Sequence, residues 1–253
     1  MKQKKIAFCL GMVLLGLSQV SFSQKNILFG VQGGVSIPDL TSGSSSNPVA
    51  SGWSSRLGSD FGILASVKVK SIFSVQVELN YSSQGGKKNG EQAVPVSYFT
   101  LTPPAGIPPI LYANLNNETK INYVQLPILA KFSFPLGGGF HFIVDAGPYA
   151  GLMVVAKTVA NGNTQFYTDQ GETQSVTQGQ SYSISVNQDI RSDIKHFNVG
   201  IQGGVGLEKK FLIGYLTLTA GGNYGFIPIQ RQSSNGQNNT GAATVKIGYL
   251  FKI

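Results

Sequence analysis

Residues 72–82 read Ile72-Phe73-Ser74-Val75-Gln76-Val77-Glu78-Leu79-Asn80-Tyr81-Ser82, a run in which apolar and polar side chains alternate. Val75, Val77 and Leu79 fall on one face, while the polar residues between them fall on the other. A period of two is typical of a β-strand whose two faces meet different surroundings. The same alternation recurs in 61–70, 196–208 and 243–253. These runs predict an all-β protein.

Eight segments have strand-like sequence, and the connectors between them come in two lengths. We expect strands at 27–36, 61–70, 72–82, 120–134, 140–157, 196–208, 213–226 and 243–253. Tight connectors at Ser71, 135–139 and 209–212 alternate with long, Ser-, Asn-, Gln-, Gly- and Pro-rich connectors at 37–60, 83–119, 158–195 and 227–242. In an up-and-down meander, every tight turn therefore lies at one end and every long loop at the other.

This asymmetry favours a membrane-spanning sheet. Bacterial outer-membrane barrels have an even number of strands, short periplasmic turns, long external loops and outward-facing apolar residues. Each tilted strand needs about 9–11 residues to cross the bilayer, which each run supplies. We expect a closed eight-stranded antiparallel up-and-down transmembrane β-barrel with short periplasmic turns and long extracellular loops.

The aromatic residues are expected at two heights, as interfacial girdles require. The group at the tight-turn end comprises Phe29, Phe73, Phe132, Phe134, Phe140, Phe142, Phe211, Tyr249 and Phe251. The group at the long-loop end comprises Phe61, Tyr81, Phe197, Tyr224 and Phe226. Two alternatives are a soluble sandwich with core aromatics and a secreted lipocalin-like barrel whose apolar face surrounds a ligand.

Composition excludes other classes. The 253 residues are 42% hydrophobic and only 12% charged, with 32 Gly, and no apolar run of about 18 residues predicts a spanning helix. The formal net charge is +8, but no Lys/Arg cluster follows the first five residues. Nucleic acid is therefore not an expected partner.

The N-terminus has the pattern of a signal peptide. Lys2, Lys4 and Lys5 precede an apolar stretch at 6–17, and Ser21-Phe22-Ser23 supplies small residues for cleavage before Gln24. We expect residues 1–23 to be removed and residues 24–253 to form one barrel domain. Cleavage also removes Cys9, the single cysteine, so no disulfide is expected in the exported chain.

Several motifs follow one another along the chain in a recognisable order. They are Phe29-Gly30-Val31-Gln32-Gly33-Gly34-Val35, Val77-Glu78-Leu79-Asn80-Tyr81-Ser82-Ser83-Gln84-Gly85, Ile121-Asn122-Tyr123-Val124-Gln125-Leu126-Pro127-Ile128-Leu129-Ala130-Lys131-Phe132, Ala146-Gly147-Pro148-Tyr149-Ala150-Gly151 and Gly248-Tyr249-Leu250-Phe251-Lys252-Ile253. Together they resemble the PorT-like outer-membrane β-barrel proteins of Bacteroidota-type bacteria. Gln125 stands where that family often has Glu, and the chain ends in Ile253 where many barrels end in an aromatic residue. The resemblance implies an outer-membrane location, and one named member of the family is linked to protein secretion.

The inward face of the predicted barrel carries a polar set. It comprises Lys68, Glu78, Tyr123, Gln125, Lys131, Asp145, Glu208 and Lys246, in which three lysines balance three carboxylates. An eight-stranded barrel has an interior just wide enough for side chains, so we interpret the set as a structural plug; an ion or proton path is the alternative. Inward glycines are expected to leave room for long Lys and Tyr side chains: Gly30, Gly34, Gly147, Gly151, Gly200, Gly204, Gly206, Gly221 and Gly225.

Enzyme chemistry has little support in the sequence. The two histidines are His141, expected low at the periplasmic rim, and His196, near the outer rim with Ser192 and Asp193 close by. A Ser/His/Asp cluster there lacks any motif context, and adjacent strand residues point to opposite faces. We expect no catalytic site, no metal and no cofactor.

The function we expect is that of a structural or interaction scaffold. Loops on rigid scaffolds commonly carry binding, so the loops at 83–119 and 158–195 are the candidates for contact with an envelope or secretion partner. The first contains the polyproline-like stretch 102–109, and in the second the alternation from Tyr182 to Val186 predicts an extended hairpin. Outer-membrane lipid, lipopolysaccharide and the barrel-assembly machinery are further expected partners. The alternatives are a lipid-modifying enzyme and a narrow pore.

Overall fold

The structure is a computed structural model that describes residues 27–43, 45–96, 106–233 and 236–252. The predicted signal peptide, residues 102–105 of the polyproline-like stretch and Ile253 lie outside these residues. Nine strands are described. They are β1 (Ile27–Thr41), β2 (Gly58–Lys68), β3 (Phe73–Pro95), β4 (Ile110–Gly137), β5 (Phe140–Thr164), β6 (Tyr182–Asp189), β7 (Phe197–Phe211), β8 (Gly214–Gly225) and β9 (Asn239–Lys252).

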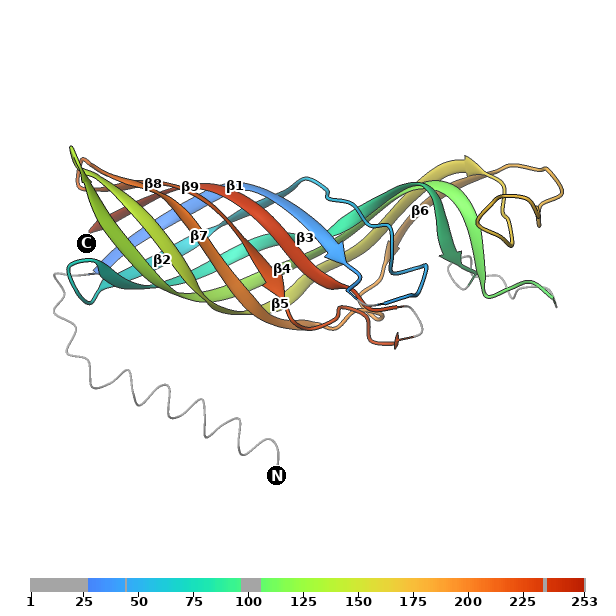
Figure 1. Ribbon diagram of the computed structural model, residues 1–253, viewed down its shortest axis with the longest axis horizontal. Helices are drawn as coiled ribbons and strands as arrows, with labels where there is room; N and C mark the ends of the chain where they lie inside the picture. Colours follow the sequence, from blue (N-terminus) through green and yellow to red (C-terminus); the bar gives the residue numbers. More distant parts are fainter. Residues whose placement is uncertain (1–26, 44, 97–105, 234–235, 253) are drawn as a thin grey trace, which may run out of the picture.

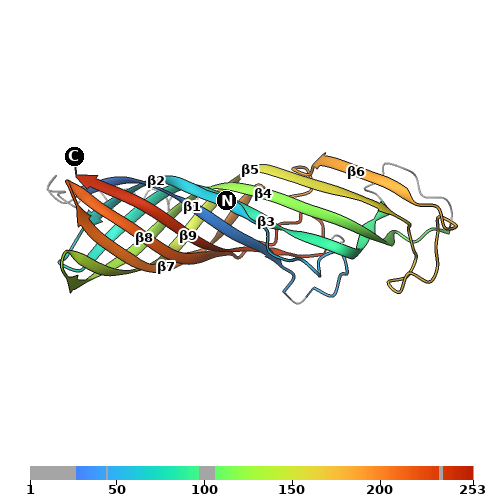
Figure 2. The ribbon, with the colours of Figure 1, turned by 90° about the horizontal axis from the view of Figure 1, so that it is seen from above.

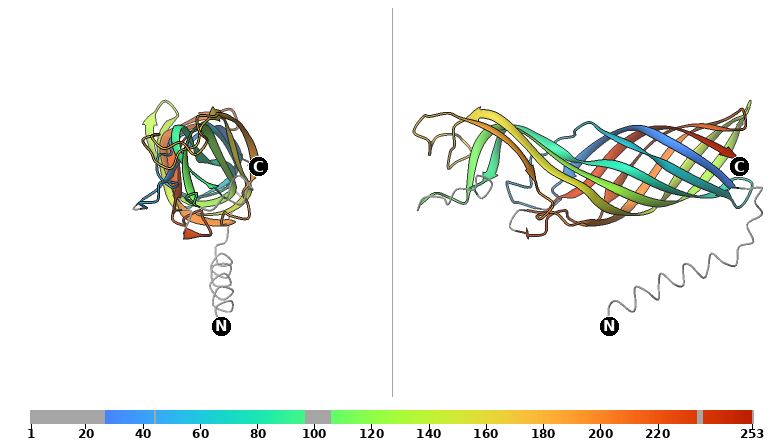
Figure 3. Two further views of the ribbon diagram at one scale, coloured as in Figure 1. Left: turned by 90° about the vertical axis from the view of Figure 1, so that its right-hand side faces the viewer. Right: turned by 180° about the vertical axis from the view of Figure 1, so that it is seen from behind.

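Eight of the strands form a closed antiparallel ring. The order around it is β4-β3-β2-β1-β9-β8-β7-β5, and β4 pairs with β5 to complete it. Viewed along the long axis, the strands enclose a barrel, and the side views show them tilted to its axis (Figure 3). The expected eight-stranded barrel is confirmed. The tight turns at 69–72, 138–139 and 212–213 lie at one end, where the chain also ends at its C-terminus (Figure 1).

The strand sequences produce this ring because their two faces have opposite character. In β3, Gln76, Glu78 and Asn80 are buried inside, while Val77 and Leu79 remain 38% and 46% exposed on the outside. The same outward exposure of large apolar residues recurs around the barrel. Soluble monomers rarely expose so large a continuous apolar surface. A lipid bilayer is the environment that this surface requires.

The aromatic residues form the two expected groups. Near the tight turns, Phe73 lies 5.2 Å from Phe132 between ring centroids, and Phe29 pairs with Phe251 across β1 and β9. Near the long loops, the Phe61 and Tyr81 rings stack 5.1 Å apart. Aromatic girdles at these two heights fit the two interfaces of a membrane.

The largest departure from expectation concerns the connectors. β3 continues to Pro95 and β4 begins at Ile110, so most of the predicted loop 83–119 is a long hairpin. β5 continues to Thr164, and β6 pairs with it from Lys157 to Thr164, as the predicted hairpin in 158–195 requires. The outer parts of β3, β4 and β5, together with β6, form a sheet that projects beyond the ring (Figures 1 and 2). We call this sheet, residues 83–95, 110–122, 153–164 and 182–189, the arm. Backbone pairing stabilises the hairpin although its sequence is largely polar.

Two apolar clusters close the barrel and support the arm at the long-loop end. The first comprises Leu40, Ile121, Tyr123, Met153, Ala156, Ile190, Ile194 and Ile229, with Trp53 packed against it. The second comprises Val94, Ala113 and Leu115, with Phe166 and Ile184 packed against it. Among the described residues, no helix has the length and apolar character needed to cross a membrane.

Candidate functional site

Glu78 is the centre of a polar network inside the barrel. One carboxylate oxygen accepts hydrogen bonds from Gln32 Nε2 at 2.9 Å and Asn80 Nδ2 at 2.7 Å, and also from Gln202 Nε2 at 3.1 Å. The other accepts from Gln76 Nε2 at 2.6 Å. Glu78 is only 2% exposed. Side-chain amides from β1, β3 and β7 therefore take the place of water around this buried carboxylate.

Two lysines complete the network. Lys246 Nζ lies 3.5 Å from Glu78 Oε2 and 4.0 Å from Asp60 Oδ1. Lys131 Nζ lies 2.6 Å from Glu208 Oε2 and is almost fully buried. Asp145 is the cross-strand partner of Lys131. Asp60 thus joins the expected charged groups of the interior. Lys68 lies toward the tight-turn end, where it lines a cavity together with Lys131 and Glu208.

The predicted inward residues occupy four different surroundings. Glu78, Lys131, Asp145, Glu208 and Lys246 lie together in the middle of the barrel. Lys68 is exposed beyond the buried stretch of β2, and Tyr123 lies in the apolar cluster at the long-loop end. Gln125 is buried, yet neither amide atom has a hydrogen-bond partner within the described residues.

The amides that surround Glu78 are the residues that sequence reasoning did not single out. The alternation that places Glu78 on the polar face of 72–82 also places Gln76 and Asn80 there, so that signal was available. Gln32 and Gln202 come from strands distant in sequence. Only closure of the ring brings them to the same carboxylate.

The middle of the barrel leaves little free space. The cavity around Glu78, Lys131 and Lys246 has a volume of about 30 Å³, while one water needs roughly 10–15 Å³. A few waters fit there. This geometry supports a packed interior, in line with the narrow bore of eight-stranded barrels.

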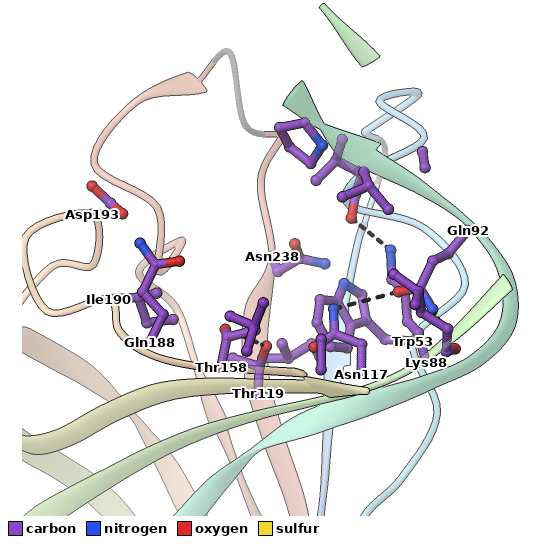
Figure 4. A pocket seen from close by; sticks show the side chains of 18 of the residues that line it. Trp53, Lys88, Gln92, Asn117, Thr119, Thr158, Gln188, Ile190, Asp193 and Asn238 are labelled. Atoms are coloured by element: carbon purple, nitrogen blue, oxygen red, sulfur yellow. Dashed lines mark hydrogen bonds between the residues drawn. The ribbon is translucent and has the colours of Figure 1, made fainter. Parts of the chain in front are cut away.

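A second site lies at the long-loop end, between the inner face of the arm and three loops. This pocket has a volume of about 100 Å³. In Figure 4 the side chains of Trp53, Lys88, Gln92 and Asn117 gather on one side, with Gln188, Ile190 and Asp193 opposite and Asn238 between them. β3, β4, β5 and β6 form one wall, and loop residues around Trp53, Ile190 and Asn238 form the others.

Lys88 is the buried cation of this pocket. Its Nζ donates to the Val49 carbonyl at 2.6 Å and lies 4.7 Å from the centroid of the Trp53 ring. Burial lowers the pKa of Lys88 from 10.5 to about 8. The ammonium group is therefore bound by other groups of the protein, and it loses its proton at a lower pH than an exposed lysine does.

Neither histidine forms part of a recognisable catalytic arrangement. His196 is exposed, and its Nε2 lies 3.0 Å from Arg231 Nη2 and 3.3 Å from the Arg191 carbonyl. Ser192 Oγ donates to Asp193 Oδ1 at 3.3 Å, so the hydroxyl and the imidazole have different partners. His141 lies at the tight-turn end. No group of three or more His, Cys, Asp or Glu suited to a metal occurs in the described part of the chain.

Comparison with known proteins gives one family match. Residues 18–231 match the family described as outer membrane protein beta-barrel domain. No curated protein matches the chain.

Several solved structures are similar over nearly their whole length. Ail, the attachment invasion locus protein of Yersinia pestis, is 10% identical with a TM-score of 0.35, over 90% of this chain and 99% of Ail. Neisserial surface protein A is 12% identical with a TM-score of 0.38, over 89% of this chain and 97% of that one. OprG from Pseudomonas aeruginosa is 11% identical with a TM-score of 0.41, over 90% of this chain and 98% of OprG.

Proposed function

The chain belongs to the outer membrane protein beta-barrel domain family, and from this membership we propose that it is a non-enzymatic interaction scaffold of the bacterial outer membrane. In such barrels the short turns face the periplasm and the long loops face outward. The arm then projects outside the cell. Its task in this proposal is to hold a partner protein there.

The observation that carries the proposal is the free edge of the arm. β6 pairs with β5 along one edge, and no described strand pairs with its other edge. Within it, Tyr182, Ser183, Ser185 and Asn187 are exposed. A strand edge with unpaired N–H and C=O groups readily accepts an extended segment of another chain. A partner that adds a strand to β6 fits this surface.

The resemblance to the PorT-like proteins supports a role in the envelope. The order of motifs, above all Asn122-Tyr123-Val124-Gln125-Leu126-Pro127 in β4, resembles the PorT-like proteins. We infer that the scaffold supports protein secretion or envelope integrity, in contact with lipopolysaccharide in the membrane and with the assembly machinery during biogenesis. The packed interior around Glu78 favours the interpretation as a structural plug and not the alternative of a pore.

Photo-crosslinking in intact cells tests the proposal. A photoreactive amino acid replaces Ser185 on the exposed side of β6. The matched control carries it at Ser71, an equally exposed serine in a tight turn at the opposite end of the barrel. We expect one discrete protein adduct at Ser185 that Ser71 does not form.

Deletion of the outer hairpin supplies the second readout. A variant lacking residues 89–114 keeps the strand segments that form the ring, because β2 pairs with β3 only as far as Ser82. We expect it to reach the outer membrane and to keep the adduct at Ser185, because β6 and the β5 residues that pair with it remain. Loss of the adduct would show that the partner contacts the deleted hairpin and not the edge of β6. Capture of lipopolysaccharide alone at Ser185 contradicts the proposal and leaves plain envelope support.

A further inference from the structure

The pocket behind the arm has walls suited to an uncharged ligand. Apolar side chains such as Leu40, Ile190 and Ile194 make up most of the lining. Lys88 is already bonded to the Val49 carbonyl. The remaining polar lining residues, apart from Asp193, are amides and hydroxyls: Gln92, Asn117, Thr119, Thr158, Gln188, Gln230 and Asn238.

Two polar atoms of these walls are buried without a hydrogen-bond partner in the described residues. They are Trp53 Nε1, which can only donate, and Asn117 Oδ1, which can only accept. The neighbouring amide of Asn238 is fully used, since it donates to the Ala50 carbonyl and accepts from Gln230. Buried polar groups are almost always paired. A ligand group that both accepts and donates a hydrogen bond would pair this donor and this acceptor.

The Asn117 amide is free to turn toward such a group. Its Nδ2 donates only a long hydrogen bond, 3.4 Å, to Gln92 Oε1. Gln92 itself is anchored by a shorter bond of 2.7 Å to the Leu115 carbonyl. A small rotation of the Asn117 side chain thus presents its oxygen to a ligand without disturbing the strand pairing.

The size of the pocket limits what enters. A cavity of about 150 Å³ holds a benzene molecule, and this one measures about 100 Å³. A whole hexose ring is too large for it, whereas a substituent of four heavy atoms fits.

We infer that the pocket binds the acetamido group of an N-acetylated sugar. The acetamido carbonyl oxygen accepts from Trp53 Nε1, its N–H donates to Asn117 Oδ1, and its methyl group packs on the apolar wall. The sugar ring stays at the opening. This site goes beyond the proposed scaffold function, because the pocket binds the sugar whether or not β6 binds a protein.

Trp53 makes the test direct, because it is the single tryptophan of the protein. The full chain, folded in zwitterionic detergent micelles, is titrated with N-acetylglucosamine while indole fluorescence is recorded. We expect a saturable change with N-acetylglucosamine and none with glucose at equal concentration. An equal response to glucose, or no response at about 100 mM, well above the ~1 mM Kd of a weak complex, overturns the inference.

Asn117→Ala removes the acceptor and is expected to weaken binding about tenfold, the effect of losing one hydrogen bond. Asn116→Ala is the matched control, because Asn116 is the exposed neighbour on the other face of β4, and its affinity should equal that of the wild type. An unchanged affinity in Asn117→Ala contradicts the assignment. Should Asn117→Ala fail to fold, the indole N–H proton resonance of the wild type decides, since it must shift when the sugar binds.

The acetamido sugar can be free or carried by lipid. Titration with N,N′-diacetylchitobiose in solution and with lipopolysaccharide micelles distinguishes the two sources. A response to either supports the inference and identifies the source, while failure of both overturns it.

Discussion

Lys131 Nζ lies 2.6 Å from Glu208 Oε2, and this ion pair joins β4 to β7 across the intervening strand β5. Both side chains are less than a tenth exposed. The pair therefore spans the contact between β4 and β5 that closes the ring. Because a buried charge without its partner is strongly unfavourable, each member depends on the other.

Replacing one member of this pair should destabilise the barrel far more than replacing both. We expect Lys131→Met to lower the free energy of unfolding by about 3–5 kcal/mol, and Lys131→Met with Glu208→Leu to recover most of that loss. Urea unfolding of the protein in micelles measures both. Lys210→Met, which changes an exposed lysine beside the tight turn between β7 and β8, should change the free energy of unfolding little. A single variant as stable as that control would show that the pair is unimportant.

Gly200 is required by the close approach of the Tyr224 carbonyl oxygen and of the Tyr149 ring. A Cβ at Gly200 would stand 2.0 Å from the Tyr224 carbonyl oxygen and 2.7 Å from Tyr149 Cε1. We expect Gly200→Ala to lower the free energy of unfolding by about 1–3 kcal/mol through overpacking. The control is Gly33→Ala, whose Cβ has Phe61 Cβ as its nearest atom at 3.6 Å. Thermal unfolding followed by gel mobility compares them, and equal midpoints would refute the steric argument.

The packed interior predicts an electrically silent barrel. The free space of about 30 Å³ around Glu78 holds only a few waters at the middle of the barrel. Planar-bilayer recordings of the wild type should show no discrete conductance steps. Glu78→Ala combined with Gln202→Ala removes two side chains that fill the interior, and should raise the ionic current through the barrel. Regular conductance steps in the wild type would favour the pore alternative.

Lys88 should make stability depend on alkaline pH. Burial lowers the pKa of Lys88 to about 8 in the folded protein, against 10.5 in the unfolded chain. Between these values the unfolded chain binds the proton that the folded protein has released, so stability rises with pH over this window. NMR of methylated lysines should show a midpoint near 8. Lys88→Met should lose both the midpoint and this part of the pH dependence.

The ring was predictable because each of its strands carries its own two-sided pattern. Val75, Val77 and Leu79 need an apolar surrounding, and the Glu78 between them needs polar partners, wherever the strand is placed. The position of Glu78, Lys131 and Lys246 inside the barrel follows from the same alternation. The closure of the ring by β4 and β5 follows from the requirement that lipid meet no open edge.

The outer part of the β3–β4 hairpin is marked less clearly in the sequence. Residues 83–95 are mostly Ser, Gln, Gly, Lys and Asn, a composition typical of loops. Leu111, Ala113 and Leu115 do alternate with polar neighbours, and this short pattern is the signal of a strand there. Pairing of β3 with β4 over many residues stabilises this region together with the apolar cluster around Leu115. Backbone hydrogen bonds leave no mark on the side-chain pattern.

The sequence by itself determined the class of the protein, the direction in which each strand residue points and the end at which the loops gather, because these depend on local alternation and connector length. Only the tertiary structure decided which groups meet. Gln32, Gln202 and Lys246 reach Glu78, and Trp53 and Asn117 share one pocket, because contacts between distant strands and loops depend on register and ring closure, which no single segment encodes.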